Sequence, residues 1–166
     1  MTAVGVSFEA PVPWFPLPAR LALLLSGRGS NFIALADARQ SGALPARIVL
    51  VLSDRAEAAG LARARARGLE AAVEERGGET RAAHEERLGA RIEAAGADVV
   101  CLAGFMRILS PAFVARFERR VVNVHPSLLP AFPGLEAQRQ AFEHGVKVAG
   151  ATVHLVDAGT DTGPIA

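Results

Sequence analysis

The chain has 166 residues, of which 51% are apolar and 21% are charged, and its formal net charge is +1. This length and composition suit one domain with a packed core and argue against wholesale disorder. Eighteen Lys and Arg against seventeen Asp and Glu also argue against a broad basic surface for nucleic acid. Cys101 is the only cysteine, which excludes an internal disulfide and a cysteine-based metal cluster, so we expect a reducing, cytoplasmic location.

Residues 1–18 are expected to form a Pro-rich tail rather than a secretory leader. Pro11, Pro13, Pro16 and Pro18 break any helix there, and no Lys or Arg precedes Arg20. Trp14 and Phe15 could form a docking patch, but a loosely ordered tail is favoured. Elsewhere the longest apolar runs have the length of strands, so no membrane span is predicted. The other residues, 19–166, are expected to form one domain.

From residue 19 onward, short apolar runs alternate with segments of helical spacing. The apolar runs predict strands over 21–25, 47–53, 70–73, 98–103, 121–124 and 149–155. The helical spacing predicts helices over 31–40, 56–67, 80–95 and 135–144, and a short helix that begins at Ser110-Pro111. This alternation predicts an α/β fold, a Rossmann-like, mostly parallel sheet with helices on both faces. Ligands bind such sheets at the carboxyl ends of the strands.

The first strand-to-helix loop has the sequence Ser26-Gly27-Arg28-Gly29-Ser30-Asn31. Its two glycines permit a tight turn with backbone N–H groups close to a ligand, and the helix N-terminus attracts anions. The loop lacks the Gly-Lys-Ser/Thr of a P-loop and the third glycine of a dinucleotide fingerprint. It is therefore either a monophosphate cradle or a plain turn in which Ser30 or Asn31 caps the helix.

Asn123 and His125 form a second candidate site. Alternate residues of a strand share a face, so both side chains point to one side at the carboxyl end of an apolar strand. An amide beside an imidazole suits stabilisation of an oxyanion and transfer of a proton, although a structural His fits the same pattern. The Gly-rich segment 157–164 carries Asp157 and Asp161, and either carboxylate could keep His125 protonated. The four His residues are scattered along the sequence and predict no metal site.

The run NVHPSLLPAFPG at 123–134 closely resembles the signature of the folate-dependent formyltransferases. The loop at 26–31, the run LAGFMRILS at 102–110 and the segment 153–164 narrow the resemblance to members that formylate glycinamide ribonucleotide in purine synthesis. The resemblance spans 21–166 and implies the formyltransferase fold. It also implies transfer of a formyl group from 10-formyltetrahydrofolate, as co-substrate, to the amine of glycinamide ribonucleotide, without a metal. These two small molecules would be the partners of a monomer or homodimer, with no nucleic acid or membrane involved.

The resemblance also implies roles for individual residues. Asn123 and protonated His125 would stabilise the tetrahedral intermediate, and Asp161 would keep His125 charged. His154 would support this group from behind, whereas His84 would only pack. The substrate phosphate would bind to Gly27, Arg28, Gly29, Ser30 and Asn31. The folate would contact Arg81, Met106, Arg107, Ile108, Leu109, Asn123, Asp157 and Asp161, with Leu102, Phe113 and Val114 as apolar walls.

Relatives of this kind continue past the position of Ala166, so the domain at 19–166 is expected to be truncated at its C-terminal end. A truncated chain would leave a sheet edge exposed, which predicts lower stability or association through that edge. Two alternatives therefore stay open. The chain could be an inactive or binding-only fragment, or a related formyltransferase or hydrolase that uses 10-formyltetrahydrofolate with another acceptor.

Overall fold

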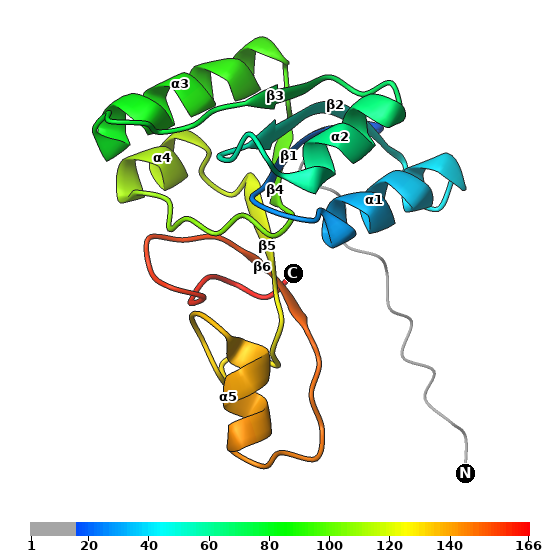
Figure 1. Cartoon of the computed structure of the whole chain (residues 1–166). Helices are drawn as coiled ribbons and strands as arrows, with labels where there is room; N and C mark the ends of the chain where they lie inside the picture. The colour runs from blue at the N-terminus through cyan, green and yellow to red at the C-terminus, as the bar shows by residue number, and fades with distance from the viewer. Residues whose placement is uncertain (1–15) are drawn as a thin grey trace.

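The computed structural model describes residues 16–166 and contains one sheet of six strands in the order β3-β2-β1-β4-β5-β6 (Figure 1). Strands β1 to β5 are parallel, and β6 is antiparallel to β5. The strand order reverses between β1 and β4, as in doubly wound α/β folds. The predicted α/β fold with a mostly parallel sheet is therefore confirmed. The strands are β1 (Ala19–Leu25), β2 (Ala46–Ser53), β3 (Ala71–Val73), β4 (Val99–Leu102), β5 (Val121–His125) and β6 (Thr152–Leu155).

Each predicted helix is present, although some begin or end elsewhere than the sequence suggests. Residues 56–58 precede the second helix rather than belonging to it, and Ala56 N there donates to Glu75 Oε1 at 3.0 Å. The last strand begins only at Thr152, because Thr152 pairs with His125, where β5 ends. Ser110 caps its helix as predicted, accepting from Phe113 N at 3.2 Å. The helices are α1 (Ser30–Gln40), α2 (Ala59–Ala66), α3 (Arg81–Ala94), α4 (Pro111–Arg116) and α5 (Ala137–Glu143).

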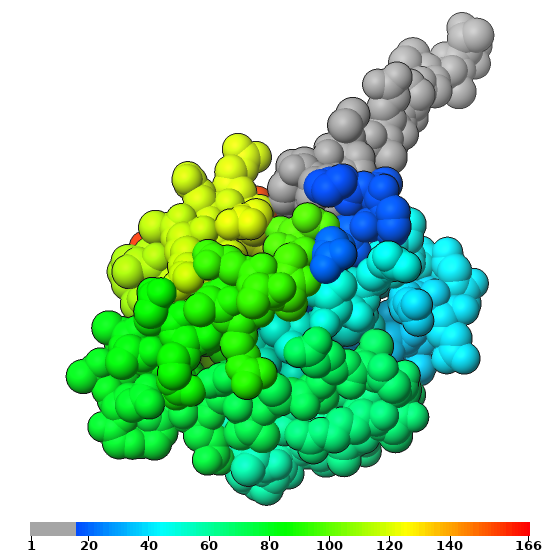
Figure 2. Space-filling model, turned by 90° about the horizontal axis from the view of Figure 1, so that it is seen from above, coloured from blue at the N-terminus to red at the C-terminus, as the bar shows by residue number. Residues whose placement is uncertain are grey.

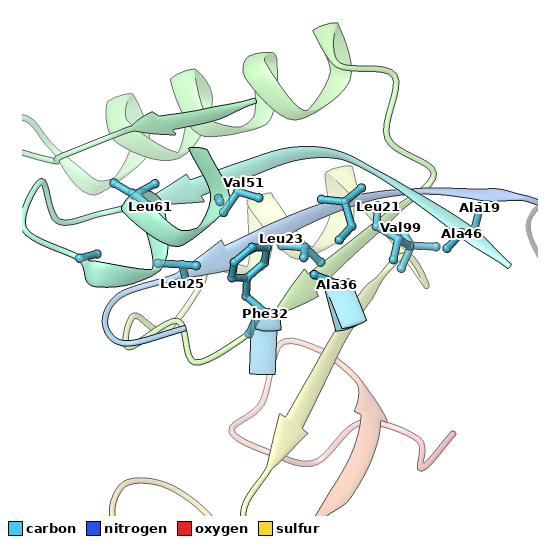
Figure 3. Packing of buried hydrophobic residues seen from close by; sticks show 14 residues of the cluster. Ala19, Leu21, Leu23, Leu25, Phe32, Ala36, Ala46, Val51, Leu61 and Val99 are labelled. Atoms are coloured by element: carbon cyan, nitrogen blue, oxygen red, sulfur yellow. The ribbon is translucent and has the colours of Figure 1, made fainter. Parts of the chain in front are cut away.

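Two apolar layers hold the sheet between its helices. Alternate residues of β1 face opposite sides, so Leu23 packs with Phe32 of α1 and Leu61 of α2 (Figure 3), whereas Leu24 packs with Leu88 of α3. All five side chains are at most 2% exposed. Full burial of one such side chain contributes about 1.5–3 kcal/mol. The chain from α1 to α3, cyan to green, makes up most of the face seen in Figure 2.

The chain after α4 is arranged differently. Helix α5 lies beyond the ends of β5 and β6, away from the other four helices (Figure 1). After β6 the chain turns back along that strand, since Leu155 N donates to Pro164 O at 2.9 Å and Ala166 N donates to Val153 O at 3.0 Å. The expected bare outer edge of the sheet is therefore partly paired by residues 164–166.

Within residues 16–166, no helix combines the length and the apolar composition that a membrane crossing requires. The tail expected over 1–18 is described only at 16–18, where all three residues are exposed. The docking patch considered at Trp14 and Phe15 lies outside the described residues.

Candidate active site

The loops that follow β1 and β4 meet at the carboxyl edge of the sheet, where ligand binding was expected. Ser26 N donates to Gly104 O at 3.0 Å, and Met106 N donates to Ser26 Oγ at 2.8 Å. These two bonds fasten the glycine loop that follows Ser26 to the loop 104–109. The two segments expected to bind the two substrates are thus neighbours.

Asn123, His125 and Asp161 come together beside the end of β5. His125 Nδ1 lies 3.2 Å from Asp161 Oδ2, and Asn123 Nδ2 lies 3.2 Å from Nε2 of His154, its cross-strand partner on β6. His154 Nε2 lies 3.5 Å from Asp161 Oδ1, so one carboxylate stands between the two imidazoles. The residues that the sequence singled out for catalysis therefore form one polar cluster with the supporting His154.

Both ring nitrogens of His125 have a hydrogen-bond acceptor beside them. Nε2 lies 2.8 Å from the backbone carbonyl of Phe132, and Nδ1 faces the Asp161 carboxylate. A carbonyl and a carboxylate can only accept, so satisfying both requires the doubly protonated imidazolium. His125 is only 4% exposed, and no water is needed to complete this arrangement. The geometry fits the protonated His125 that the resemblance implies.

The backbone around His125 is held in conformations that L-residues rarely adopt. Phe132 has φ 54° and Asp161 has φ 55°, both in the left-handed region. Such residues cost about 1–3 kcal/mol each and concentrate at functional sites. Here they present the Phe132 carbonyl and the Asp161 carboxylate to one imidazole. Asp161 Oδ2 also accepts from Gly134 N at 2.8 Å, which fixes the carboxylate.

His154 orients the amide of Asn123. Its Nδ1 donates to the carbonyl of Leu155 at 3.0 Å, so in the neutral tautomer Nε2 is free to accept from Asn123 Nδ2. One N–H of that amide is thereby used, and the other remains for a ligand. His154 is 2% exposed and does not reach the surface. It contacts the cluster through Asn123, and its supporting role stays a prediction.

The structure distinguishes the two candidate carboxylates of the last loop. Asp157 Oδ1 accepts from Gly159 N at 3.0 Å and from Thr162 Oγ1 at 2.8 Å, so it shapes its own turn. Asp161 alone of the two has an ion-pair distance to His125.

Two adjoining cavities share the loop 105–109 as a wall. The first, of about 240 Å³, has the cluster of Asn123, His125 and Asp161 on one side and is lined by seven of the eight residues expected to contact folate. The eighth, Arg81, lines the second cavity, of about 350 Å³. Leu102 is a wall of the first cavity, as expected. Phe113 and Val114 were also expected there, but they are buried in the core cluster of the α3–α4 face, and neither lines these two cavities.

Residues 27–29 form a tight loop, and Ser30 and Asn31 are the first two residues of α1. The expectation that Ser30 or Asn31 caps this helix is wrong, because Gly29 occupies the cap with φ 73° and the helix begins at Ser30. A Cβ at Gly29 would stand 2.9 Å from the Cα of Gly60 in α2, and Gly60 N donates to Gly27 O at 3.0 Å. Close contact with α2 therefore sets the shape of this loop. Its residues are not among those that line the two cavities.

Sequence reasoning missed three groups that support the site. The first is the Phe132 carbonyl beside His125. The second is the Glu85 carboxylate, which accepts from Ser110 N at 2.9 Å and from Arg81 Nε at 3.0 Å. Arg81 in turn donates to Ile108 O at 2.6 Å. The third is the Asp54 carboxylate, which accepts from Arg107 Nε at 2.6 Å. Asp54 had a detectable signal, since it is the first charged residue after an apolar strand. The other two depend on contacts that no spacing reveals.

His84 packs as expected. It is 2% exposed, and its Nε2 lies 2.6 Å from the carbonyl of Glu74. Across residues 16–166, no three His, Cys, Asp or Glu side chains are grouped closely enough to hold a metal ion.

Comparison with known proteins agrees with this geometry. The family model described as Formyl transferase matches residues 19–166. The phosphoribosylglycinamide formyltransferase of Mycobacterium tuberculosis is 49% identical over 148 residues, and the trifunctional purine biosynthetic protein adenosine-3 of Drosophila melanogaster is 46% identical over 149 residues. Among solved structures, glycinamide ribonucleotide transformylase 1 from Symbiobacterium toebii superposes with a TM-score of 0.87 at 51% identity.

The match covers very different shares of the relatives' own lengths. It covers 89% of this chain and 68% of the Mycobacterium protein, and 89% of this chain and 70% of the Symbiobacterium chain. For the Drosophila protein it covers 88% of this chain but only 11% of that much longer protein.

Proposed function

The chain belongs to the formyl transferase family, in its phosphoribosylglycinamide formyltransferase group, and on this premise we propose that it transfers a formyl group from 10-formyltetrahydrofolate to the amine of glycinamide ribonucleotide. The observation that carries the proposal is the cluster of Asn123, His125 and Asp161 on the wall of one cavity. The step would belong to purine biosynthesis, which the name of the Drosophila relative gives for that protein.

The reaction begins when the free amine attacks the formyl carbon. A carbon–nitrogen bond forms, and the formyl oxygen becomes an oxyanion. The unused N–H of the Asn123 amide is available to donate to this oxygen, because His154 occupies the other N–H. One preorganised donor of this kind typically contributes about 10²–10³ in rate.

In this proposal His125 supplies a positive charge beside the intermediate and assists the transfer of a proton to the leaving folate nitrogen. The tetrahedral intermediate collapses by breaking the bond to N10 of the folate, and N10 takes up a proton as the attacking amine loses one. To donate to the intermediate, His125 Nε2 must exchange the Phe132 carbonyl for a substrate atom. Asp161 keeps its contact with Nδ1 during this exchange, so the imidazolium stays oriented.

The two substrates would approach from adjoining loops. The pterin end of the folate would lie in the cavity of about 240 Å³, against Met106 to Leu109 and below the 157–161 loop. The phosphate of the ribonucleotide would bind at 27–31, where backbone N–H groups and the start of α1 attract an anion. The hydrogen bonds of Ser26 would keep the two substrates side by side. The protein groups used in these steps are an amide, an imidazole and a carboxylate. A cytoplasmic location stays a prediction.

An assay that compares samples with and without the acceptor tests this proposal against a hydrolase and a binding-only protein. The full chain is mixed with 10-formyltetrahydrofolate, with and without glycinamide ribonucleotide, and formylated product and free formate are measured. The proposal predicts product that depends on the ribonucleotide. Formate release that does not depend on it would identify a hydrolase. Folate binding without either product would identify a binding-only protein.

A further inference from the structure

The glycine loop between β1 and α1 uses its carbonyl groups and its N–H groups differently. The carbonyls of Gly27, Arg28 and Gly29 each accept a hydrogen bond from another part of the protein. The backbone N–H groups of residues 27–31 have no hydrogen-bond partner in the part of the chain that the structure describes. The loop therefore directs its acceptors into the protein and leaves its donors available for a ligand.

Helix α2 supplies the donors for two of these three carbonyls. Gly60 N donates to Gly27 O at 3.0 Å, and Arg63 Nη1 donates to Arg28 O at 2.8 Å. The third carbonyl, that of Gly29, is used in the first turn of α1. A Cβ at Gly60 would lie only 3.2 Å from Gly27 O, so the lack of a side chain there allows α2 to approach the loop. The shape of the loop therefore depends on α2 as well as on α1.

Arg63 has no carboxylate beside it within residues 16–166. Arg67, one turn further along α2, does pair with Asp37 of α1, with 3.3 Å between Nη2 and Oδ1. Arg63 is exposed, and its one recorded hydrogen bond is the one to the Arg28 carbonyl. Holding a long surface side chain in one place costs rotamer freedom and returns little stability. This arrangement therefore suggests a purpose other than strengthening the fold.

We propose that Arg63 is a positioning residue, which holds the Arg28 carbonyl toward α2 so that the N–H groups of the loop face the phosphate of the ribonucleotide. This inference rests on the proposed function. In a trans peptide the C=O of one residue and the N–H of the next share a plane and point in opposite directions. Fixing the Arg28 carbonyl therefore fixes the N–H of Gly29. Successive N–H groups turned to one side form a concavity that binds anions.

Fixing the loop before the ligand arrives has a physical advantage. A glycine-rich segment has more conformations to lose on binding than any other, and a segment already held in place loses fewer. Without Arg63, the peptide between Arg28 and Gly29 could rotate and turn its carbonyl toward the phosphate, which would repel it. The loss of Arg63 should therefore weaken the binding of the ribonucleotide. The folate should be unaffected, because its expected segment is fastened through Ser26 and not through α2.

Two ligands separate this role from general support of the fold. The first is glycinamide ribonucleotide, and the second is 5-formyltetrahydrofolate, a stable isomer of the co-substrate. Dissociation constants are measured by titration calorimetry for the wild type, Arg63→Met and Arg63→Lys. We expect Arg63→Met to weaken the ribonucleotide by about tenfold and the folate by less than about twofold. Arg63→Lys should restore most of the affinity, because an ammonium group can still donate to the Arg28 carbonyl.

A measurement without ligand separates positioning from direct contact with the phosphate. The heteronuclear NOE of the amides of residues 27–31 reports the order of the loop on the picosecond to nanosecond timescale. In the ligand-free protein, Arg63→Met should lower these values, because the loop loses an anchor before any phosphate is present. Arg63→Lys should keep them close to those of the wild type.

Arg65→Met is the matched control. Arg65 lies on the same helix, is also exposed, and donates to the carbonyl of Ala71 on β3 rather than to the loop. Its replacement removes the same charge and should change neither the two dissociation constants nor the order of the loop. Circular dichroism on each sample establishes folding, and Arg63→Gln takes the place of Arg63→Met if that variant does not fold.

Three outcomes would overturn the proposal. Weaker ribonucleotide binding with an unchanged loop would mean that Arg63 contacts the phosphate itself. Equal weakening of both ligands would mean that Arg63 supports the whole domain, and unchanged constants would mean that the loop needs no anchor.

The wild type shows whether the proposed function fails as well. If it binds the folate but not the ribonucleotide, the acceptor assigned in the proposed function fails together with this inference. If it binds both ligands and only the Arg63 predictions fail, the proposed function stands.

Discussion

The two parts of the molecule are stabilised in different ways. In residues 19–120 the sheet is covered by α1 and α2 on one face and by α3 and α4 on the other, and the apolar side chains are largely buried. There, the large apolar residues that remain exposed are Met106 and Ile108, on the wall of the cavities. Residues 121–166 leave many more in solvent: Val124, Leu128, Leu135, Phe142, Val146, Val148, Val153 and Ile165.

Polar bonds hold the second part instead. Thr152 Oγ1 donates to Ser127 O at 2.7 Å and accepts from Leu129 N at 2.9 Å. Asp161 and His125 add the contacts to Gly134 and Phe132. The side chains proposed for catalysis therefore also help to shape their own surroundings. We infer that changes in the first part act on global stability, whereas changes in the second act on activity and local order.

The largest effect is expected in the apolar layer between the sheet and helices α1 and α2. Phe32 belongs to α1 and is completely buried against β1. Phe32→Ala should therefore lower the free energy of unfolding by about 3–5 kcal/mol, measured by urea denaturation. The matched control is Phe142→Ala on α5, because Phe142 is 85% exposed and should change stability by less than about 0.5 kcal/mol. Similar losses at the two positions would contradict the contrast between the two parts.

The next effect concerns the two carboxylates of the last loop. Asp161→Asn removes the charge beside His125 Nδ1 and should lower kcat by about a hundredfold. Asp157→Asn is the matched control and should change kcat little, because the Asp157 carboxylate only shapes its own turn. A large loss of kcat for Asp157→Asn alone would reassign the catalytic carboxylate.

A smaller effect is expected at the glycine loop. Gly29→Ala forces a Cβ against Gly60 at positive φ, so the loop must move, and the KM for the ribonucleotide should rise by about tenfold. The KM for the folate should change much less. Gly42 has a similar positive φ, 80° against 73°, but open space around its Cβ, so Gly42→Ala separates backbone strain from the contact. Equal changes in both KM values would remove the phosphate assignment.

The last prediction concerns the chemical reactivity of the Cys101 thiol rather than the stability of the fold. Burial raises the pKa of the Cys101 thiol to about 12, so the thiol remains protonated at pH 8. Cys101 lies on β4 and pairs with Val122 of β5, at the border between the two parts. Alkylation by iodoacetamide, followed by mass spectrometry, should be much slower in the native protein than in urea. Rapid alkylation of the native protein would show that this border opens readily.

The fold was predictable because buried parallel strands are read directly from the sequence as apolar runs. Leu21 to Leu25 and Arg47 to Ser53 are such runs, and their strands are central. The pairing of Asn123 with His125 was predictable for a similar reason, since it needs only the alternation of side chains along a strand.

Contacts between distant segments were not predictable. Asp54 and Arg107 are 53 positions apart, and Glu85 and Ser110 are 25 apart, so only the folded sheet brings them together. The choice between Asp157 and Asp161 depends on how one turn is folded. Ser30 and Asn31 were plausible caps by residue type, but the close approach of α2 places Gly29 there instead.

The central claim is that the cluster at the end of β5 performs formyl transfer. The most direct measurement is the rate of ribonucleotide-dependent formyl transfer by the wild type, Asn123→Ala and Gln40→Ala, with folate binding measured on each sample. Gln40 lies exposed at the end of α1 and is the control for loss of an amide. The account predicts turnover by the wild type and Gln40→Ala, and a rate about 10²–10³ lower for Asn123→Ala, with folate binding little changed. Undiminished turnover by Asn123→Ala, or a folded wild type that binds folate without turnover, would contradict it.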